Sequence, residues 1–173
     1  MAVRGPTRSG PVTSLKLVTI DGDSIQREDV PGHHPGVQSK DSVRVAAKDV
    51  LADGVVAITL VRPDGDRLPD WTPGSHIDVV VPDSGGSSLV RQYSLCGDRW
   101  DAHSYRIAVL REPQSRGGSQ YLVDELAVGD LISIGTPRNH FKLSPARRFQ
   151  FIAGGIGITP IMTMIDAADV DGA

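Results

Sequence analysis

The chain has 173 residues, a net charge of −3 at pH 7 and 39% apolar residues. This length accommodates one full domain, or one domain and part of a second. The charge argues against a nucleic-acid binder that works through a broad basic face. Cys96 is the only cysteine, which excludes an internal disulfide and a four-cysteine metal site within the chain and favours a cytoplasmic protein. No apolar run approaches the ~18 residues of a membrane span, so we expect no membrane association.

The first 42 residues differ from the rest of the chain. They contain four prolines and show little hydrophobic periodicity, so we expect residues 1–42 to form a flexible tail, with one short strand at 15–20. The stretch 33–36 (His-His-Pro-Gly) is typical of a turn. Because no carboxylate or further histidine stands at ligand spacing, a solvated loop is favoured over a metal site, and no metal site is predicted anywhere in the chain.

From residue 43 on, short segments of alternating polarity are separated by turn signals. In one segment Val56, Ile58 and Leu60 share a face, as a half-buried strand requires. Six strands at such spacings are typical of an antiparallel barrel or sandwich. The pattern predicts these strands at residues 43–50, 55–62, 76–81, 89–96, 104–111 and 131–135.

One short helix is predicted between the last two strands, at residues 119–126. Leu122 and Leu126 are four residues apart, so they share a helix face. Ser119 is suited to the N-cap position, because its hydroxyl can accept a hydrogen bond from a backbone N–H of the first turn.

The pattern changes again after Pro145. Residues 149–153 are almost uninterruptedly apolar, and a glycine turn and a helical stretch to about residue 168 follow them. We expect Thr159 to cap this helix, with Pro160 at its first position. A strand, a glycine turn and a helix are the first elements of a βαβ unit. Too few residues follow them for the second parallel strand of that unit. The chain is therefore expected to end inside a second domain.

Arg91 and Tyr93 form the first of three candidate ligand-binding segments. Alternation places both side chains on one face of the predicted fourth strand. A guanidinium suits a phosphate group through two parallel hydrogen bonds, and a phenol suits a planar ring by stacking. An ordinary surface pair of the same residues is the alternative.

The second candidate segment is the run of Arg116, Gly117, Gly118 and Ser119 at the predicted helix start. The glycines allow close backbone approach, the arginine adds charge and the serine adds a hydroxyl, which together suit an anion. A capped glycine turn explains the same residues equally well.

The third candidate segment contains Gly154, Gly155, Gly157, Thr159 and Pro160 between the predicted strand and helix. This is the setting of a dinucleotide-binding turn, although the spacing departs from Gly-x-Gly-x-x-Gly because a proline replaces the last glycine. A tight strand-to-helix turn is the alternative.

Taken in this order, the motifs resemble those of the ferredoxin–NADP reductase superfamily, and most closely its phthalate dioxygenase reductase and vanillate demethylase reductase type. Residues 91–95 (Arg-Gln-Tyr-Ser-Leu) are similar to the family's flavin motif, and residues 116–119 to its flavin-phosphate loop. Residues 137–141 (Pro-Arg-Asn-His-Phe) are similar to the segment that closes its barrel, and residues 154–160 to its nicotinamide signature. The likeness extends over about residues 43–168.

The resemblance implies a mainly β fold. Residues 43–146 would form a six-stranded antiparallel flavin-binding barrel with one short helix. Residues 147–173 would form the first βα unit of a truncated parallel α/β nicotinamide domain. The family also carries a plant-type iron–sulfur domain, whose cysteines this sequence does not contain, so we expect a 2Fe–2S cluster only in a full-length parent.

For activity, the resemblance implies an NAD(P)H-dependent flavin oxidoreductase. It would pass electrons from NAD(P)H through the flavin to an iron–sulfur acceptor, an oxygenase or a ferredoxin-type protein. FMN is favoured over FAD. The alternative is a non-enzymatic flavin-binding module, or an inactive fragment without the hydride-donor site.

The resemblance also assigns roles to residues of the chain. Tyr93 would cover the flavin ring, and Arg91, Arg116 and Ser119 would hold its phosphate. The family places Ser94 near the reactive flavin nitrogen, although strict alternation turns Ser94 away from Tyr93. No residue is predicted to be catalytic in its own right, because the flavin carries the redox chemistry.

Overall fold

The computed structural model describes residues 19–21, 24–26, 40–82, 86–114 and 117–170. Near the N-terminus, β1 (Thr19–Asp21) and β2 (Ser24–Gln26) pair with each other as an antiparallel two-stranded sheet. The strand predicted at 15–20 therefore coincides with β1 only at its last two residues. The rest of that prediction and the turn at 33–36 lie outside the described residues.

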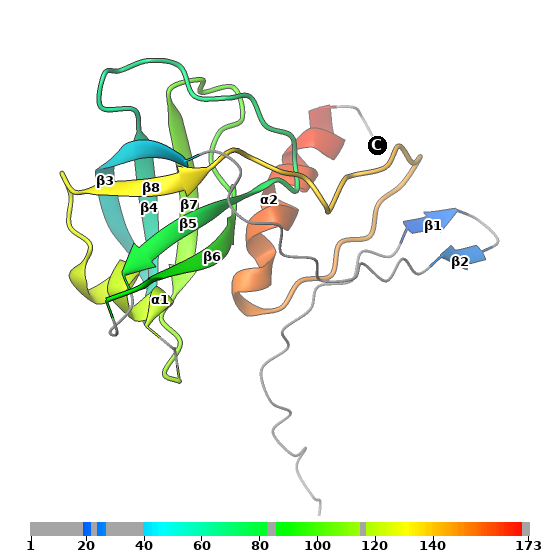
Figure 1. The fold of residues 1–173 in the computed structure, drawn as a ribbon. Coiled ribbons are helices and arrows are strands. Elements are labelled where there is room, and N and C mark those ends of the chain that lie inside the picture. The colour runs from blue at the N-terminus through cyan, green and yellow to red at the C-terminus, as the bar shows by residue number, and fades with distance from the viewer. Residues whose placement is uncertain (1–18, 22–23, 27–39, 83–85, 115–116, 171–173) are drawn as a thin grey trace, which may run out of the picture.

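A six-stranded antiparallel sheet forms the body of the protein (Figure 1). Its strands confirm the six predicted ones, with ends that differ by three residues at most. Strand order in the sheet is β6-β5-β8-β3-β4-β7. The strands are β3 (Lys40–Ala52), β4 (Val55–Val61), β5 (His76–Pro82), β6 (Ser88–Ser94), β7 (Ser104–Leu110) and β8 (Leu131–Gly135).

Strand β3 is long enough to pair with two neighbours. Residues 40–44 pair with β8, and residues 44–52 pair with β4. The register to β4 shifts between Val45 and Ala47 and again between Val50 and Ala52. Such irregularities bend a strand and increase its twist. At the two ends of the strand order, Leu95 just after β6 and Ile107 in β7 make an isolated bridge.

The core lies on one side of this curved sheet and follows the two-residue period of its strands. Val56, Ile58 and Leu60 are all buried, as predicted, and Leu122 and Leu126 add the apolar face of the helix. Each fully buried aliphatic side chain of this size contributes about 1.5–3 kcal/mol. The other buried core side chains on the strands are Val43, Val45, Ile77, Val79, Val81, Tyr105, Ile107, Val109, Ile132 and Ile134.

The helix predicted at 119–126 exists, but its start and geometry differ from the prediction. It consists of α1 (Gly118–Gln120) followed by the π-helical turn η1 (Tyr121–Glu125). Gly117 occupies the N-cap position, so the prediction that Ser119 caps the helix is wrong. At the other end Lys48 Nζ donates to the carbonyl oxygens of Val123 (2.8 Å) and Leu126 (2.6 Å), groups that a helix end leaves without partners.

The strand predicted at residues 149–153 is not formed. These residues have irregular backbone, Ile152 is 73% exposed, and the rings of Phe149 and Phe151 stack on each other at 5.7 Å. An apolar parallel strand needs neighbours on both edges and cover on both faces, and the described part of the chain provides no strand to pair with it.

The helix predicted after the glycine turn is present as α2 (Ile158–Val170), preceded by the 3-10 turn η2 (Gly155–Gly157). Thr159 lies inside the helix, and its Oγ1 donates to the Ile156 carbonyl at 3.0 Å. The predicted N-cap role of Thr159 is therefore wrong. Pro160 stands in the first turn, where its missing N–H costs nothing.

Helix α2 lies beside the sheet (Figure 1), and its Ile161, Met164 and Ala168 side chains are buried. Gly74, in the connection between β4 and β5, marks the contact point. Its φ is +88°, and a Cβ there would overlap the Phe141 carbonyl oxygen and lie 2.6 Å from Met164 Cε. Only glycine fits, because both the backbone angle and the space exclude a side chain. None of the described helices is long and apolar enough to cross a membrane.

Candidate functional site

Arg91 and Tyr93 lie on the same side of β6, as predicted. Exposure alternates along the strand, with Leu89, Arg91 and Tyr93 half-buried and the residues between them exposed. The Tyr93 ring packs against the core. Burial raises the pKa of Tyr93 to about 12, and the nearby Arg91 guanidinium opposes the rise. The phenol is therefore neutral and can donate a hydrogen bond at physiological pH.

The structure brings the first two candidate segments together. Gly117, with φ +106°, opens α1, and the next residue, Gly118, faces Arg91. A Cβ on Gly118 would lie 2.8 Å from Arg91 Cγ and 3.0 Å from Arg91 Nε. The arginine side chain therefore lies directly against the glycine backbone. A guanidinium is thus adjacent to a glycine turn whose backbone a ligand can approach closely. Such a pairing suits an anion.

Ser119 is buried beside this turn. Its Oγ accepts the backbone N–H of Glu112 at 3.1 Å. Because that oxygen already accepts, the hydroxyl proton is left to donate to another acceptor. Arg116, the fourth residue of this segment, lies outside the described residues.

Ser94 ends β6 on the face opposite to Tyr93, as alternation predicts. It pairs with His76 of β5, whereas Tyr93 pairs with the buried Ile77. The His76 ring lies 5.4 Å from that of His140. Burial and the Arg138 guanidinium lower the pKa of His76, so its imidazole is neutral at pH 7.

Residues 137–141 bind the start of β5. Arg138 and His76 exchange two backbone hydrogen bonds of 2.9 Å each. Arg138 Nη2 also pairs with the buried Asp78 carboxylate at 2.6 Å, and Gln92 donates to the same carboxylate. This ion pair on the outer face of β5 and β6 was not predicted, because strand alternation marks Asp78 as a solvent-facing position.

The third candidate segment lies beside β7. Gly154 and Gly155 are exposed, and η2 approaches β7. Thr159 and Pro160 are buried in α2, and Gly157 is half-buried.

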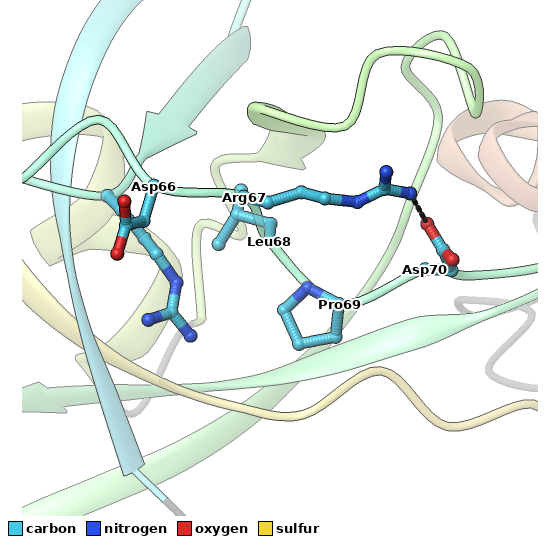
Figure 2. Close-up of a pocket in the computed structure, with 6 residues that line it drawn as sticks. Asp66, Arg67, Leu68, Pro69 and Asp70 are labelled. Atoms are coloured by element: carbon cyan, nitrogen blue, oxygen red, sulfur yellow. Dashed lines mark hydrogen bonds and ion pairs between the residues drawn. The ribbon is translucent and has the colours of Figure 1, made fainter.

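A measurable cavity of about 460 Å³ lies elsewhere, on the connection between β4 and β5 (Figure 2). Arg62, Asp66, Arg67, Leu68, Pro69 and Asp70 line it. It shares no residue with the three candidate segments. The sequence did not predict this cavity, because local patterns do not reveal how a loop folds back on itself.

Comparison with known proteins identifies the fold and its relatives. No protein-family model matches the chain. A phthalate 4,5-dioxygenase oxygenase reductase subunit of Pseudomonas putida is 43% identical over 124 residues, which are 71% of this chain and 37% of that protein. The chain is homologous to the oxygenase reductases of the phthalate dioxygenase type. A vanillate O-demethylase oxidoreductase of a Pseudomonas strain is 42% identical over 70% of this chain and 38% of its own length.

A crystal structure from the same reductase family supports the assignment. Phthalate dioxygenase reductase, described as a modular structure for electron transfer from pyridine nucleotides to a 2Fe–2S centre, matches with a TM-score of 0.68 and 35% identity. The match extends over 77% of this chain and 40% of that structure. The predicted family is confirmed, and the chain spans about two fifths of the length of these relatives.

Proposed function

We propose that this chain is the flavin-binding part of an oxygenase reductase, which passes electrons from NAD(P)H through a flavin to an iron–sulfur acceptor. One observation carries the proposal: the Arg91 side chain lies against the Gly118 backbone, 2.8 Å from where a Cβ would stand. This contact joins two sequence motifs that are similar to flavin-binding motifs of the family. A phosphate-bearing planar ligand fits a guanidinium, a glycine turn and a half-buried tyrosine ring.

In the proposed site Arg91, Arg116 and Ser119 hold the flavin phosphate. Ser119 would donate its hydroxyl proton, since its oxygen already accepts the Glu112 N–H. Gly117 and Gly118 would allow the phosphate to come close to the backbone. FMN fits this set better than FAD, because these residues account for one phosphate; FAD is the alternative.

Tyr93 would cover one face of the flavin ring, and Ser94 would contact its reactive edge at the end of β6. The flavin, when bound, supplies two-electron acceptance and one-electron release. The side chains of this chain supply position and charge. Tyr93 keeps a neutral, hydrogen-bonding phenol against the ring, because burial holds its pKa near 12.

We further infer that the sheet closes into a barrel between β6 and β7. The isolated bridge from Leu95 to Ile107 and the hydrogen bond from Cys96 N to Arg106 O (2.9 Å) support this closure. The nicotinamide domain would begin after this barrel, at the turn that contains Gly154, Gly155, Gly157, Thr159 and Pro160.

In a full-length parent, the remaining strands of that domain and an iron–sulfur cluster would complete the path to an oxygenase or ferredoxin-type partner. The predicted cytoplasmic location rests on the single cysteine of the chain.

Two measurements test the proposal. The purified chain should bind FMN and turn yellow, and dithionite should bleach it. A colourless chain that fails to take up FMN would overturn the flavin site. Stopped-flow mixing with NADH then tests hydride transfer. We expect bleaching no faster than that of free FMN, because no strand of the described residues pairs with 149–153 and Gly154–Pro160 would supply only the first turn of a nicotinamide site.

The alternative, a flavin-binding module without reductase activity, is favoured by one specific observation. The strand that should start the nicotinamide domain is absent at residues 149–153 of the described chain. Rapid, saturable bleaching by NADH would exclude this alternative and establish a working reductase.

A further inference from the structure

Lys48 stands at a position of β3 that points to the core side of the sheet. It pairs with Ile58 of β4, as Val45 pairs with Leu60, and both partners are buried in the core. Residues directly opposite each other in antiparallel strands share a face, so Val45 and Lys48 point to the same side. The extra residue between them comes from the register shift between Val45 and Ala47. A β-bulge of this kind re-aims the side chains that follow it.

The Lys48 ammonium group binds the end of the helical turn η1. Its Nζ donates to the Val123 carbonyl oxygen at 2.8 Å and to the Leu126 carbonyl oxygen at 2.6 Å. Leu126 is the C-cap of η1, and a helix leaves its last carbonyl oxygens without partners and favours a cation beside them. Turning a lysine toward a core is costly unless its donors are used. The bulge therefore brings a charged donor to the one place on this face that needs it.

The same helical turn begins at the glycines that would approach the flavin phosphate. Helix α1 continues directly into η1. Tyr121 N donates to the Gly117 carbonyl oxygen and Leu126 N to the Tyr121 carbonyl oxygen, both at 2.9 Å. Consecutive hydrogen-bonded turns fix the backbone between them. The position of the Leu126 end therefore determines the position of Gly118 at the other end.

The other contacts of this helical turn leave a task for Lys48. Leu122 and Leu126 are buried in the core, but apolar packing is non-directional. The Arg111–Asp124 ion pair is exposed, and such pairs contribute little. Hydrogen bonds depend on direction, so the two bonds from Lys48 fix how the turn lies on the core.

We propose that Lys48 is a positioning residue for the flavin phosphate. By holding the C-terminal end of η1, it keeps Gly118 and Ser119 where they meet the Arg91 guanidinium. The inference rests on the proposed function, because it concerns the same phosphate site. Lys48 acts through the helical turn, since the stretch from Gly118 to Leu126 spans about 10 Å at the rise of a helix, and salt screens charges over about that distance.

A comparison of FMN with riboflavin tests the proposal. Lys48→Met keeps an unbranched apolar side chain and removes the ammonium group. By fluorescence titration its FMN affinity should fall about tenfold, because the displaced turn loses one charge-assisted hydrogen bond to the phosphate. Its affinity for riboflavin, which has no phosphate, should not change. Lys48→Arg retains the charge and a donor for these carbonyls, and should restore most of the FMN affinity.

A matched lysine and a salt series separate position from charge. Lys142→Met removes the same charge from an exposed residue next to Phe141, whose carbonyl faces Gly74, and it should leave FMN affinity unchanged. Direct attraction between Lys48 and the phosphate would fade as salt is raised, whereas a displaced turn weakens FMN binding at high salt as well. The proposal is wrong if the two methionine variants behave alike, if the loss disappears at high salt, or if riboflavin binding falls equally.

Hydrogen exchange of the flavin-free chain provides a measurement that needs no cofactor. In Lys48→Met the amides of residues 117–122 should exchange faster, while those of β5 remain protected. Unchanged exchange at residues 117–122 would overturn the positioning role. If circular dichroism shows that Lys48→Met does not fold, Lys48→Gln, which keeps a polar group on the core side, takes its place with the same expectations.

The two proposals fail in different ways. A wild-type chain that takes up no FMN refutes the proposed function, and the exchange rates of residues 117–122 then decide alone whether Lys48 holds the turn. A wild-type chain that binds FMN, together with a folded Lys48→Met variant that binds it equally well, refutes only the positioning role of Lys48.

Discussion

The sheet region, residues 40–135, and the segment 149–170 have similarly apolar sequences but different structures. In the sheet region every predicted strand forms and buries one face, so that Ile107 is fully buried. In the segment 149–170 the helix forms, while the apolar run before it stays irregular and leaves Ile152 73% exposed. Helix α2 buries Met164 and exposes Met162 and Ile165 on its other side.

The two regions differ in how their backbone N–H and C=O groups find hydrogen-bond partners. An antiparallel strand finds its neighbour across a short turn, as β3 finds β4 across Asp53-Gly54. A parallel strand needs a neighbour that returns after a crossover of a dozen or more residues. A helix satisfies its own backbone, so α2 forms without a neighbouring strand. Residues 149–153 need one, and the described part of the chain does not provide it.

The largest expected effect comes from matched truncations in the two regions. Ile107→Ala removes a fully buried side chain and should lower the free energy of unfolding by about 2–5 kcal/mol. Ile152→Ala removes an exposed one and should change it by about 0.5 kcal/mol or less. Urea denaturation measures both. Equal losses would mean that the two regions are packed alike and that the comparison is wrong.

FMN affinity should depend on the sheet region alone. Arg91→Ala removes a charge-assisted contact of about 1.5–3 kcal/mol, which corresponds to about tenfold or more in affinity. Ser119→Ala should cost less, because the backbone N–H groups remain, and Thr159→Ala in α2 should leave FMN binding unchanged. Fluorescence titration with FMN decides these cases. Riboflavin, which has no phosphate, is the control: if it bound as tightly as FMN, Arg91 and Ser119 would not hold a phosphate.

Gly74 joins the two regions, and its substitution should separate them. In Gly74→Ala the new methyl group overlaps the Phe141 carbonyl and presses on Met164. Overpacking of this kind costs about 1–3 kcal/mol, and we expect α2 to move away from the sheet. Hydrogen exchange should accelerate in residues 158–170 while β3 and β4 remain protected. Unchanged protection of α2 would show that the helix does not depend on this contact.

The sequence predicted most of the fold because antiparallel strands and turns have local signals. The alternation at Val56, Ile58 and Leu60 and the Asp53-Gly54 turn are enough to place one hairpin. Helix ends were less predictable, since a serine or threonine near a glycine turn has other partners: Ser119 accepts from Glu112, and Thr159 donates to Ile156. These partners depend on tertiary contacts that a local pattern does not contain.

For the candidate site, the sequence correctly put Arg91 and Tyr93 on one side of a strand. It did not show that the Arg91 side chain lies against Gly118, because residues 91 and 118 meet only in the folded chain. The buried Asp78–Arg138 pair was missed for the same reason. The roles of the site residues and the flexible tail at residues 1–42 remain predictions.

The contribution of the tyrosines to alkaline stability reports on the sheet region, because all three (Tyr93, Tyr105 and Tyr121) lie in it. Burial raises the pKa of Tyr93 from its ordinary value near 10 to about 12. Below pH 10 the phenol is protonated in both the folded and the unfolded chain, and its contribution is fully present. Between pH 10 and 12 only the unfolded chain loses the proton, so stability falls as pH rises.

This loss can be isolated by comparing the protein with its Tyr93→Phe variant. One proton released on unfolding corresponds to at most about 1.4 kcal/mol per pH unit. Above pH 10 Tyr93→Phe should therefore lose stability less steeply. The pKa values of Tyr105 and Tyr121 are also raised by burial, but both residues titrate in both proteins, so their effect cancels in the difference. Urea denaturation at pH 9, 10 and 11 measures the slopes. Parallel slopes would mean that Tyr93 is open to solvent, which would remove the half-buried ring that the flavin site requires.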